Sequence, residues 1–287
     1  MLAIIFALIA LVGWGVGDIF TTFATRKIGS YNASFYGYVF GTLISSLYIP
    51  FAINTLINFK LEMIVLTLIL SVFQIVAFIA YNEALRIGNS SLVGTIAGAF
   101  TSLVVILSLI FLGEKLSSEQ LISIIIIFVG LFLSSLNFLD LKLKKTFINK
   151  GTLFALLAMI GWAIYFTFIK IPVQESGFFW PTYLSTISGV IILLILGFRK
   201  IKKPKLGLHS GFPAVFISGV LLTIGSFGFN IGISQGLSSV VAPIAGAYPA
   251  LYALLAFYIF KDPINKQQKL GMVVALVGII LLAYLSR

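Results

Sequence analysis

Long apolar runs separated by short polar segments make up almost the whole chain. Ten of these runs are long enough to cross a bilayer and are bounded by charged or turn-forming residues. Their unbroken apolar character predicts α-helices, because the strands of a membrane barrel alternate apolar and polar positions. The first run follows Met1 without a basic segment, so we expect a first span here and not a signal peptide. The predicted spans cover residues 2–23, 34–54, 63–85, 92–112, 120–136, 152–169, 179–198, 212–234, 240–260 and 270–285.

A shift of 148 positions lays the first half of the sequence on the second. Nine of sixteen positions are identical between residues 88–103 and 236–251, where chance would give about one or two. We therefore predict an internal duplication, with five-helix copies at 1–138 and 151–287 and a basic linker at 139–150. The residues retained in both copies include Gly13 with Gly161, Trp14 with Trp162, Asn82 with Asn230 and Gly130 with Gly278.

The odd number of helices in each copy determines how the copies face each other. Five crossings carry the chain to the other side, so the second copy enters the membrane from the side opposite to the first. The predicted fold class is an all-α membrane protein with ten transmembrane helices formed by two inverted five-helix repeats. Inverted repeats recur in secondary transporters, whose halves move about a site near the bilayer midplane.

Composition leaves little room outside the membrane. Hydrophobic residues make up 60% of the chain and charged residues 9%, against about 25% charged residues in an ordinary soluble domain. Ten helices use about 200 of the 287 positions, which excludes a separate soluble catalytic or nucleic-acid-binding domain. The absence of cysteine and the single His209 exclude disulfides and thiolate or multi-histidine metal sites. No nucleotide-binding or hydrolase motif is present, so we expect no cofactor and no enzymatic activity.

The basic residues predict the orientation. Counted over alternate loops, fifteen Lys and Arg residues fall on one side of the predicted membrane and four on the other. The side with fifteen includes the linker and the loop at 199–205. Cytoplasmic loops carry the excess of positive charge, so we predict a protein of the cell membrane with both termini outside. The net charge of +11 then faces an anionic leaflet.

Several short motifs, in their order along the duplicated frame, resemble a known transporter family. They are Gly13-Trp14-Gly15, Tyr81-Asn82-Glu83-Ala84-Leu85, Gly113-Glu114-Lys115-Leu116, and Pro249-Ala250-Leu251 followed by Asp262 and Gln268. The pattern resembles the drug/metabolite transporter superfamily in its EamA-like branch. The resemblance implies a proton-linked, exchange or facilitated carrier of small organic molecules, often an exporter of amino acids or other metabolites. The sequence departs from the family pattern at two places. Thr101 stands in the first copy where the second copy has Pro249, and residues 261–263 replace the usual glycine-glutamate.

Asp18 is the strongest candidate for chemistry, because it lies about 24 Å along the first span at 1.5 Å per residue. A carboxylate at that depth normally faces a cavity or a partner. It could bind a substrate amine or carry a proton. Alternatively, the span ends soon after Gly17 and Asp18 pairs with Arg26 or Lys27 near the interface.

Other candidates share helix faces with Asp18 or are retained in both copies. Their helical spacing places them on common faces, and an aromatic, sparsely polar cavity between the copies would suit an amphipathic organic solute. Alternatively, the tryptophans form an interfacial belt and the amides join neighbouring helices. The full predicted substrate-binding set is Trp14, Asp18, Gln74, Tyr81, Asn82, Trp162, Asn230 and Tyr248.

Prolines and glycines predict where helices bend and touch. Pro243 and Pro249 fall in the ninth span where the fourth has threonines, so we expect a kink in the ninth span only, serving as a gate. Glycines four apart predict close helix contacts. These pairs are Gly37 with Gly41, Gly94 with Gly98 and Gly232 with Gly236.

These features favour a secondary transporter of small organic metabolites, such as amino acids, that exports them by alternating access. The expected partners are a small-molecule substrate and the lipid bilayer, with no nucleic acid. The alternative is an intramembrane enzyme acting on a lipid-like substrate, although Asp18 and Glu83 supply little of the chemistry it needs. A scaffold would need larger loops. Substrate, direction, proton coupling and oligomeric state are left open by the sequence.

Overall fold

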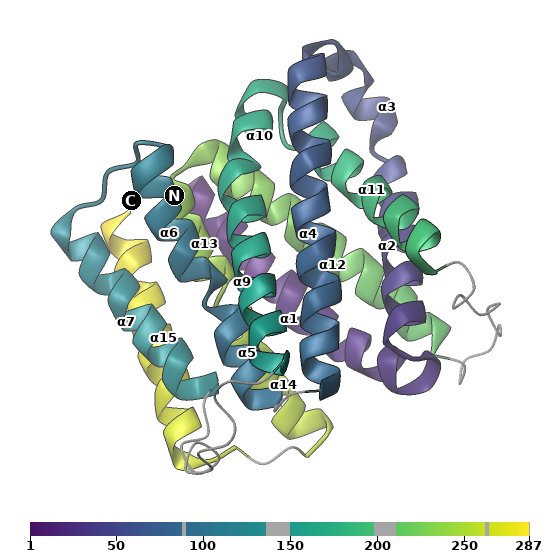
Figure 1. Cartoon of the computed structure of the whole chain (residues 1–287). Coiled ribbons are helices and arrows are strands. Elements are labelled where there is room, and N and C mark those ends of the chain that lie inside the picture. Colours follow the sequence, from purple (N-terminus) through teal and green to yellow (C-terminus); the bar gives the residue numbers. More distant parts are fainter. Residues whose placement is uncertain (88–89, 136–149, 198–210, 262–263, 287) are drawn as a thin grey trace.

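A computed structural model describes residues 1–87, 90–135, 150–197, 211–261 and 264–286, and within these ranges every regular element is a helix (Figure 1). The elements are α1 (Leu2–Ile28), α2 (Ser30–Ser46), α3 (Ile49–Ala52), the 3-10 helix η1 (Ile53–Asn58), α4 (Leu61–Ile87), α5 (Ser90–Gly98), α6 (Phe100–Phe111), α7 (Ser118–Ser135), α9 (Lys150–Phe168), α10 (Lys170–Ser176), α11 (Phe179–Gly197), α12 (Phe212–Gln235), α13 (Ser238–Ala245), α14 (Tyr248–Ile259) and α15 (Lys266–Leu285). The predicted linker and the loop at 199–205 lie mostly or wholly outside the described residues.

Most of these helices are long and apolar enough to cross a membrane. Among the described residues, eight stretches meet that test, with α9 and α10 forming one and α13 and α14 another. A ninth is added if α2 and the α3–η1 segment, bent by 55°, count as one span. The stretch at Ile96–Phe111 is apolar but shorter. A multi-pass helical membrane protein is thus confirmed, whereas ten spans and their inverted arrangement stay predictions.

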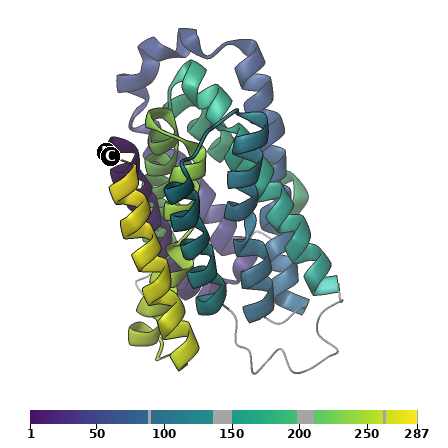
Figure 2. The ribbon, with the colours of Figure 1, turned by 90° about the vertical axis from the view of Figure 1, so that its left-hand side faces the viewer.

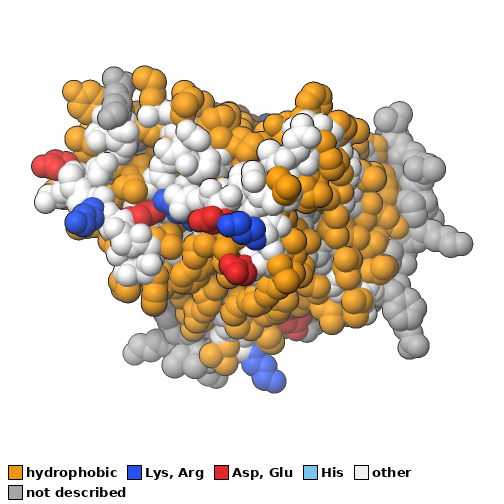
Figure 3. Space-filling model, turned by 90° about the horizontal axis from the view of Figure 1, so that it is seen from above, with side chains coloured by type: hydrophobic (Ala, Val, Ile, Leu, Met, Phe, Trp, Pro, Cys, Tyr) orange, Lys and Arg blue, Asp and Glu red, His pale blue; other side chains and the backbone are white. Residues whose placement is uncertain are grey.

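Both chain ends lie at the same end of the bundle (Figures 1 and 2), as the ten predicted crossings would require. We call this the terminus end. Seen from that end, a few charged side chains form a band surrounded by apolar surface (Figure 3). The flanks are strongly apolar, and Leu270, Val273 and Ile280 on α15 are each more than half exposed. Such surfaces suit lipid chains and not water.

Helices of the first copy pack chiefly against helices of the second, in the pairs α1–α12, α4–α9 and α7–α15. A Cβ added to Gly13 would lie 2.8 Å from the backbone of Gly225, and one added to Gly161 would lie 2.9 Å from Ala77. Under the shift of 148, Gly13 corresponds to Gly161 and Ala77 to Gly225. The two contacts are therefore equivalent, as a two-fold relation between the copies requires.

The expected difference between the fourth and ninth spans is not seen in the backbone. The ninth span is interrupted between α13 and α14 at Ala247, whose N–H bonds the Ile244 carbonyl at 3.2 Å. The fourth is interrupted at the equivalent Ala99, whose N–H bonds Ile96 at the same distance. Since the first copy lacks both prolines, proline is not needed for the break. Pro249 lies in the first turn of α14, where its missing N–H removes no helical bond.

Only some of the glycines in the predicted pairs lie at close contacts between helices. A Cβ added to Gly94 or Gly98 would meet nothing within 4 Å, so the prediction was wrong for this pair, whereas the Gly37 carbonyl lies 3.0 Å from a Cβ added to Gly219 and takes part in the α2–α12 contact. The closest approach to a neighbouring backbone among the described residues occurs at Gly130, where an added Cβ would lie 2.2 Å from the Ala275 backbone in the α7–α15 crossing.

Candidate functional site

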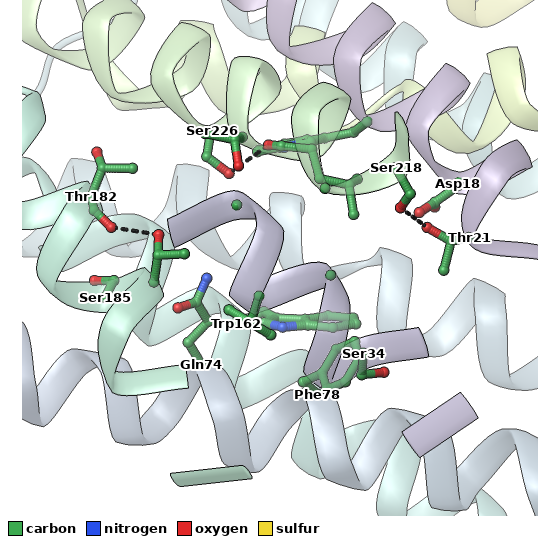
Figure 4. Close-up of a pocket in the computed structure, with 18 of the residues that line it drawn as sticks. Asp18, Thr21, Ser34, Gln74, Phe78, Trp162, Thr182, Ser185, Ser218 and Ser226 are labelled. Atoms are coloured by element: carbon green, nitrogen blue, oxygen red, sulfur yellow. Dashed lines mark hydrogen bonds between the residues drawn. The ribbon is translucent and has the colours of Figure 1, made fainter. Parts of the chain in front are cut away.

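A cavity of about 240 Å³ lies between the two copies (Figure 4). Helices α1, α2, α4 and α6 contribute to its wall from the first copy, and α9, α11, α12 and α14 from the second. The volume is close to the lower end of small-molecule pockets, which hold about 300–1,000 Å³. The space therefore suits a solute the size of a small metabolite.

Aromatic rings from both copies form one wall of the cavity. Trp14 of α1 lies 5.5 Å from Phe166 of α9 and 5.8 Å from Tyr248 of α14, between ring centroids. Phe100 of α6 packs against Trp162 at 5.7 Å and Phe166 at 5.2 Å. All five side chains line the cavity. Because the rings support one another at these distances, the wall is held in place by packing.

Asp18 of α1 lines the cavity and follows directly on the apolar run at 2–17. The helix continues ten residues beyond it to Ile28, so Asp18 does not lie near a helix end. In the described part of the chain, its carboxylate makes no hydrogen bond or ion pair. The neighbouring hydroxyls are engaged elsewhere: Thr21 bonds Ser218 at 2.6 Å, and Thr22 donates to the Asp18 carbonyl at 2.8 Å. The alternative of an interfacial residue is therefore not favoured by the helix geometry.

The opposite part of the cavity carries an amide and several hydroxyls. Gln74 of α4 lies beside Thr182 and Ser185 of α11 (Figure 4). Its side-chain oxygen is buried and accepts no hydrogen bond. Asn230 of α12 donates to the Thr182 hydroxyl at 2.5 Å and orients it. The cavity thus has a carboxylate at one end and uncharged polar groups at the other.

Five of the eight predicted binding residues line this cavity. They are Trp14, Asp18, Gln74, Trp162 and Tyr248. Tyr81 stands behind Trp162, with ring centroids 5.2 Å apart, and Asn230 acts through Thr182. Asn82 is partly buried and is not part of the described lining. Their binding role stays a prediction.

The cavity also includes residues of the second and seventh predicted spans, which were not predicted to line it. Ser34, Gly37 and Tyr38 of α2 line the cavity, as does Thr186 of α11. A usable indication was present on α11, where Thr182, Ser185 and Thr186 follow i, i+3, i+4 spacing and so share one face of an otherwise apolar helix.

A second polar cluster, which we call the Glu114 cluster, joins the two copies at the terminus end. The Glu114 carboxylate accepts hydrogen bonds from the Lys170 ammonium at 2.6 Å, the Ser238 backbone N–H at 2.7 Å and the Ser239 backbone N–H and hydroxyl at 2.8 and 2.6 Å. Lys170 also donates to the Gly236 carbonyl at 2.9 Å. Gly113, at φ +64°, makes the turn after α6 that presents Glu114.

The Glu114 cluster is electrostatically matched. The Glu114 carboxylate lies at the N-terminus of α13, and the Lys170 ammonium lies against the carbonyl of Gly236, which precedes α13. Both side chains are buried. Burial by itself raises the pKa of Glu114, but the hydrogen bonds from Lys170 and Ser239, with the charge of Lys170, outweigh it and hold the pKa below its ordinary value. Glu114 is therefore ionised at neutral pH and binds the second copy.

Sequence comparison identifies the family on both copies. Residues 1–136 and 149–284 match the EamA-like transporter family, and the two segments begin with the same shift of 148 positions that aligns the copies. A protein of Archaeoglobus fulgidus named as an uncharacterized transporter is 23% identical over 292 residues and covers 98% of each chain. An uncharacterized protein of Methanocaldococcus jannaschii is 28% identical over 135 residues, which are 47% of this chain but 97% of that protein. That relative therefore corresponds to one copy.

One further likeness covers about half of the chain, and another is a likeness of fold. The LicB protein of Haemophilus influenzae is 26% identical over 148 residues, 47% of each chain. A solved crystal structure superposes with a TM-score of 0.79 at 15% identity, covering 99% of this chain and 97% of the other, which establishes a shared fold and nothing about the solute. The family match spans nearly the whole sequence, and the chain accordingly belongs to the EamA-like transporter family and is a multi-pass membrane transporter.

Proposed function

We propose that the protein is a secondary transporter that moves a small amphipathic organic solute by alternating access between its two copies. The observation that carries this proposal is the cavity between the copies, with an aromatic wall from both and polar groups at its two ends. A site shared by two similar halves can be exposed to either side when one half tilts against the other.

The positions of the cavity and the Glu114 cluster support alternation. The lining residues Thr21, Ser34 and Ser218 lie in the parts of α1, α2 and α12 far from the terminus end. The Glu114 cluster ties the copies together at the terminus end by buried, charged hydrogen bonds. In the proposed cycle this arrangement is the state closed at the terminus end, and transport requires a second state in which the Glu114 cluster opens.

Export of metabolites, including amino acids, is the direction and cargo that the family resemblance suggests. The positive-inside rule would then place the terminus end outside the cell, so the described state would be closed to the exterior. Loading from the cytoplasm would precede opening of the Glu114 cluster.

The test is solute flux in liposomes containing the purified protein. Thr186→Trp fills the cavity from α11, whereas Ile195→Trp adds the same ring to a lipid-facing position of that helix, 70% exposed. We expect counterflow of a transported solute with the parent and Ile195→Trp, and none with Thr186→Trp. Product formation without flux would replace this proposal with the intramembrane enzyme. Equal flux through both variants would show that the cavity is not the route.

A further inference from the structure

The charge of the cavity restricts the solutes that it can hold. The Asp18 side chain has no hydrogen bond or ion pair with the residues that the structure describes, and no Lys, Arg or His occurs among the described lining residues. A buried carboxylate without a counter-charge is unfavourable because it loses its hydration, so it either takes up a proton or pairs with a cation. A bound cation would restore the missing interaction.

The aromatic wall favours the same kind of solute. Rings attract a cation held over their faces, and Trp gives the strongest attraction. Trp14 and Asp18 are four residues apart on α1 and so share a helix face, while Tyr248 packs 5.8 Å from the Trp14 ring. An ammonium between them would contact a carboxylate and aromatic faces together.

Amino acid zwitterions fit the cavity less well. A solute carboxylate would find no cationic side chain in the described lining and would add a second negative charge to that of Asp18. The Gln74 side-chain oxygen is buried and accepts no hydrogen bond from the described residues, so it can accept one from a donor on the solute or from water. A neutral solute would leave Asp18 unpaired.

We propose that the transported solute is a small organic monocation, an amine or quaternary ammonium with an apolar body and no acidic group. Its cationic end lies between Asp18 and the Trp14–Tyr248 rings, and its other end lies toward Gln74 and the α11 hydroxyls. This assignment rests on the proposed transport function and names its substrate class.

Three probes of similar size separate the possibilities. Phenethylamine is a cation, phenethyl alcohol is its neutral counterpart, and L-phenylalanine adds a carboxylate to the amine. A ligand that binds only the folded state raises thermal stability, so each probe is titrated against the purified protein in a thermal-shift measurement. We expect stabilisation by phenethylamine and a much weaker effect of the other two.

Asp18→Asn tests the residue, and Glu62→Gln, which removes an exposed carboxylate outside the cavity, is the matched control. Removing one partner of a buried charge pair typically costs a factor of about thirty or more in affinity, so phenethylamine binding should fall by that much in Asp18→Asn and stay unchanged in Glu62→Gln. Because Asp18 is unpaired among the described residues, unliganded Asp18→Asn should melt at or above the parent temperature, which would show that the variant folds.

The outcomes distinguish the substrate class from the transport function. Stabilisation by L-phenylalanine or the alcohol equal to that by the amine, or none by the amine, overturns the cation assignment. Liposome flux of any solute would still uphold transport. If Asp18→Asn binds phenethylamine like the parent but loses accumulation driven by a proton gradient, Asp18 carries a proton and the direct contact is overturned.

Discussion

Replacing Lys170 by methionine isolates the contribution of the Glu114 cluster to stability. Methionine keeps most of the apolar length of lysine but removes the ammonium that bonds Glu114 at 2.6 Å and the Gly236 carbonyl at 2.9 Å. Glu114 would remain buried with the donors of Ser238 and Ser239 but without an opposite charge.

The expected loss of stability depends on the hydrogen bonds that Glu114 keeps in the variant. Removing one partner of a buried ion pair costs about 3–5 kcal/mol, and the three hydrogen bonds that Glu114 retains place the loss at the lower end, about 3 kcal/mol. One kcal/mol corresponds to about 2–4 °C in melting temperature for chains of 150–250 residues. We therefore expect Lys170→Met to melt about 6–12 °C below the parent.

The assay is thermal unfolding in a fixed detergent with a matched control. Lys115→Met removes an exposed lysine next to Glu114, in the segment between α6 and α7, and should change stability by less than about 0.5 kcal/mol. The double variant Glu114→Leu/Lys170→Met removes both charges and should recover much of the loss, since no uncompensated charge remains. Equal melting temperatures for Lys170→Met and Lys115→Met would refute the assignment of a stabilising ion pair.

The pH dependence has a defined sign. The pKa of Glu114 is held below its ordinary value of 4.5, so its stabilisation is complete above that pH and is lost as the pH falls through the lowered pKa. The parent should therefore lose more stability between neutral and acidic pH than Glu114→Gln, which has no such titration. Parallel curves for the two proteins would contradict this.

Three further predictions concern packing, orientation and gating. Gly130→Ala should lower the melting temperature through a 2.2 Å clash with the Ala275 backbone, whereas Gly94→Ala, which meets nothing within 4 Å, should not; equal melting would show that the α7–α15 crossing can adjust. In the cysteine-free background, Lys115→Cys should react with an impermeant maleimide in intact cells and Lys266→Cys only after permeabilisation, and the reverse pattern would invert the topology. Pro249→Ala should keep its stability within about 1 kcal/mol, because Pro249 lies in the first turn of α14, while slowing transport; an unchanged rate and affinity would leave the proline purely structural.

Some features of the site could be predicted because they depend on local spacing. Trp14 and Asp18 share a helix face by virtue of being four residues apart, and both line the cavity. Trp162 was found through the duplication and also lines it. Pro243 and Pro249 predicted a kink in the ninth span only, but the fourth span is also interrupted, at Ala99, without proline. Proline is one cause of a helix break and not the only one.

The sequence by itself determined the membrane-spanning helical character, the duplication and the candidate carboxylate, since each follows from hydropathy or from residues compared at a constant shift. Only the tertiary structure decided which helices meet. Hydropathy marks a residue as apolar but does not distinguish a lipid-facing side from a protein-facing one, so the α2 and α11 walls of the cavity went unseen. Glu114 was likewise not predicted to join the two copies, because the sequence shows only a carboxylate in a loop after the fourth predicted span. Its partners Lys170, Ser238 and Ser239 lie 56 to 125 positions away, and folding alone places them within hydrogen-bonding distance.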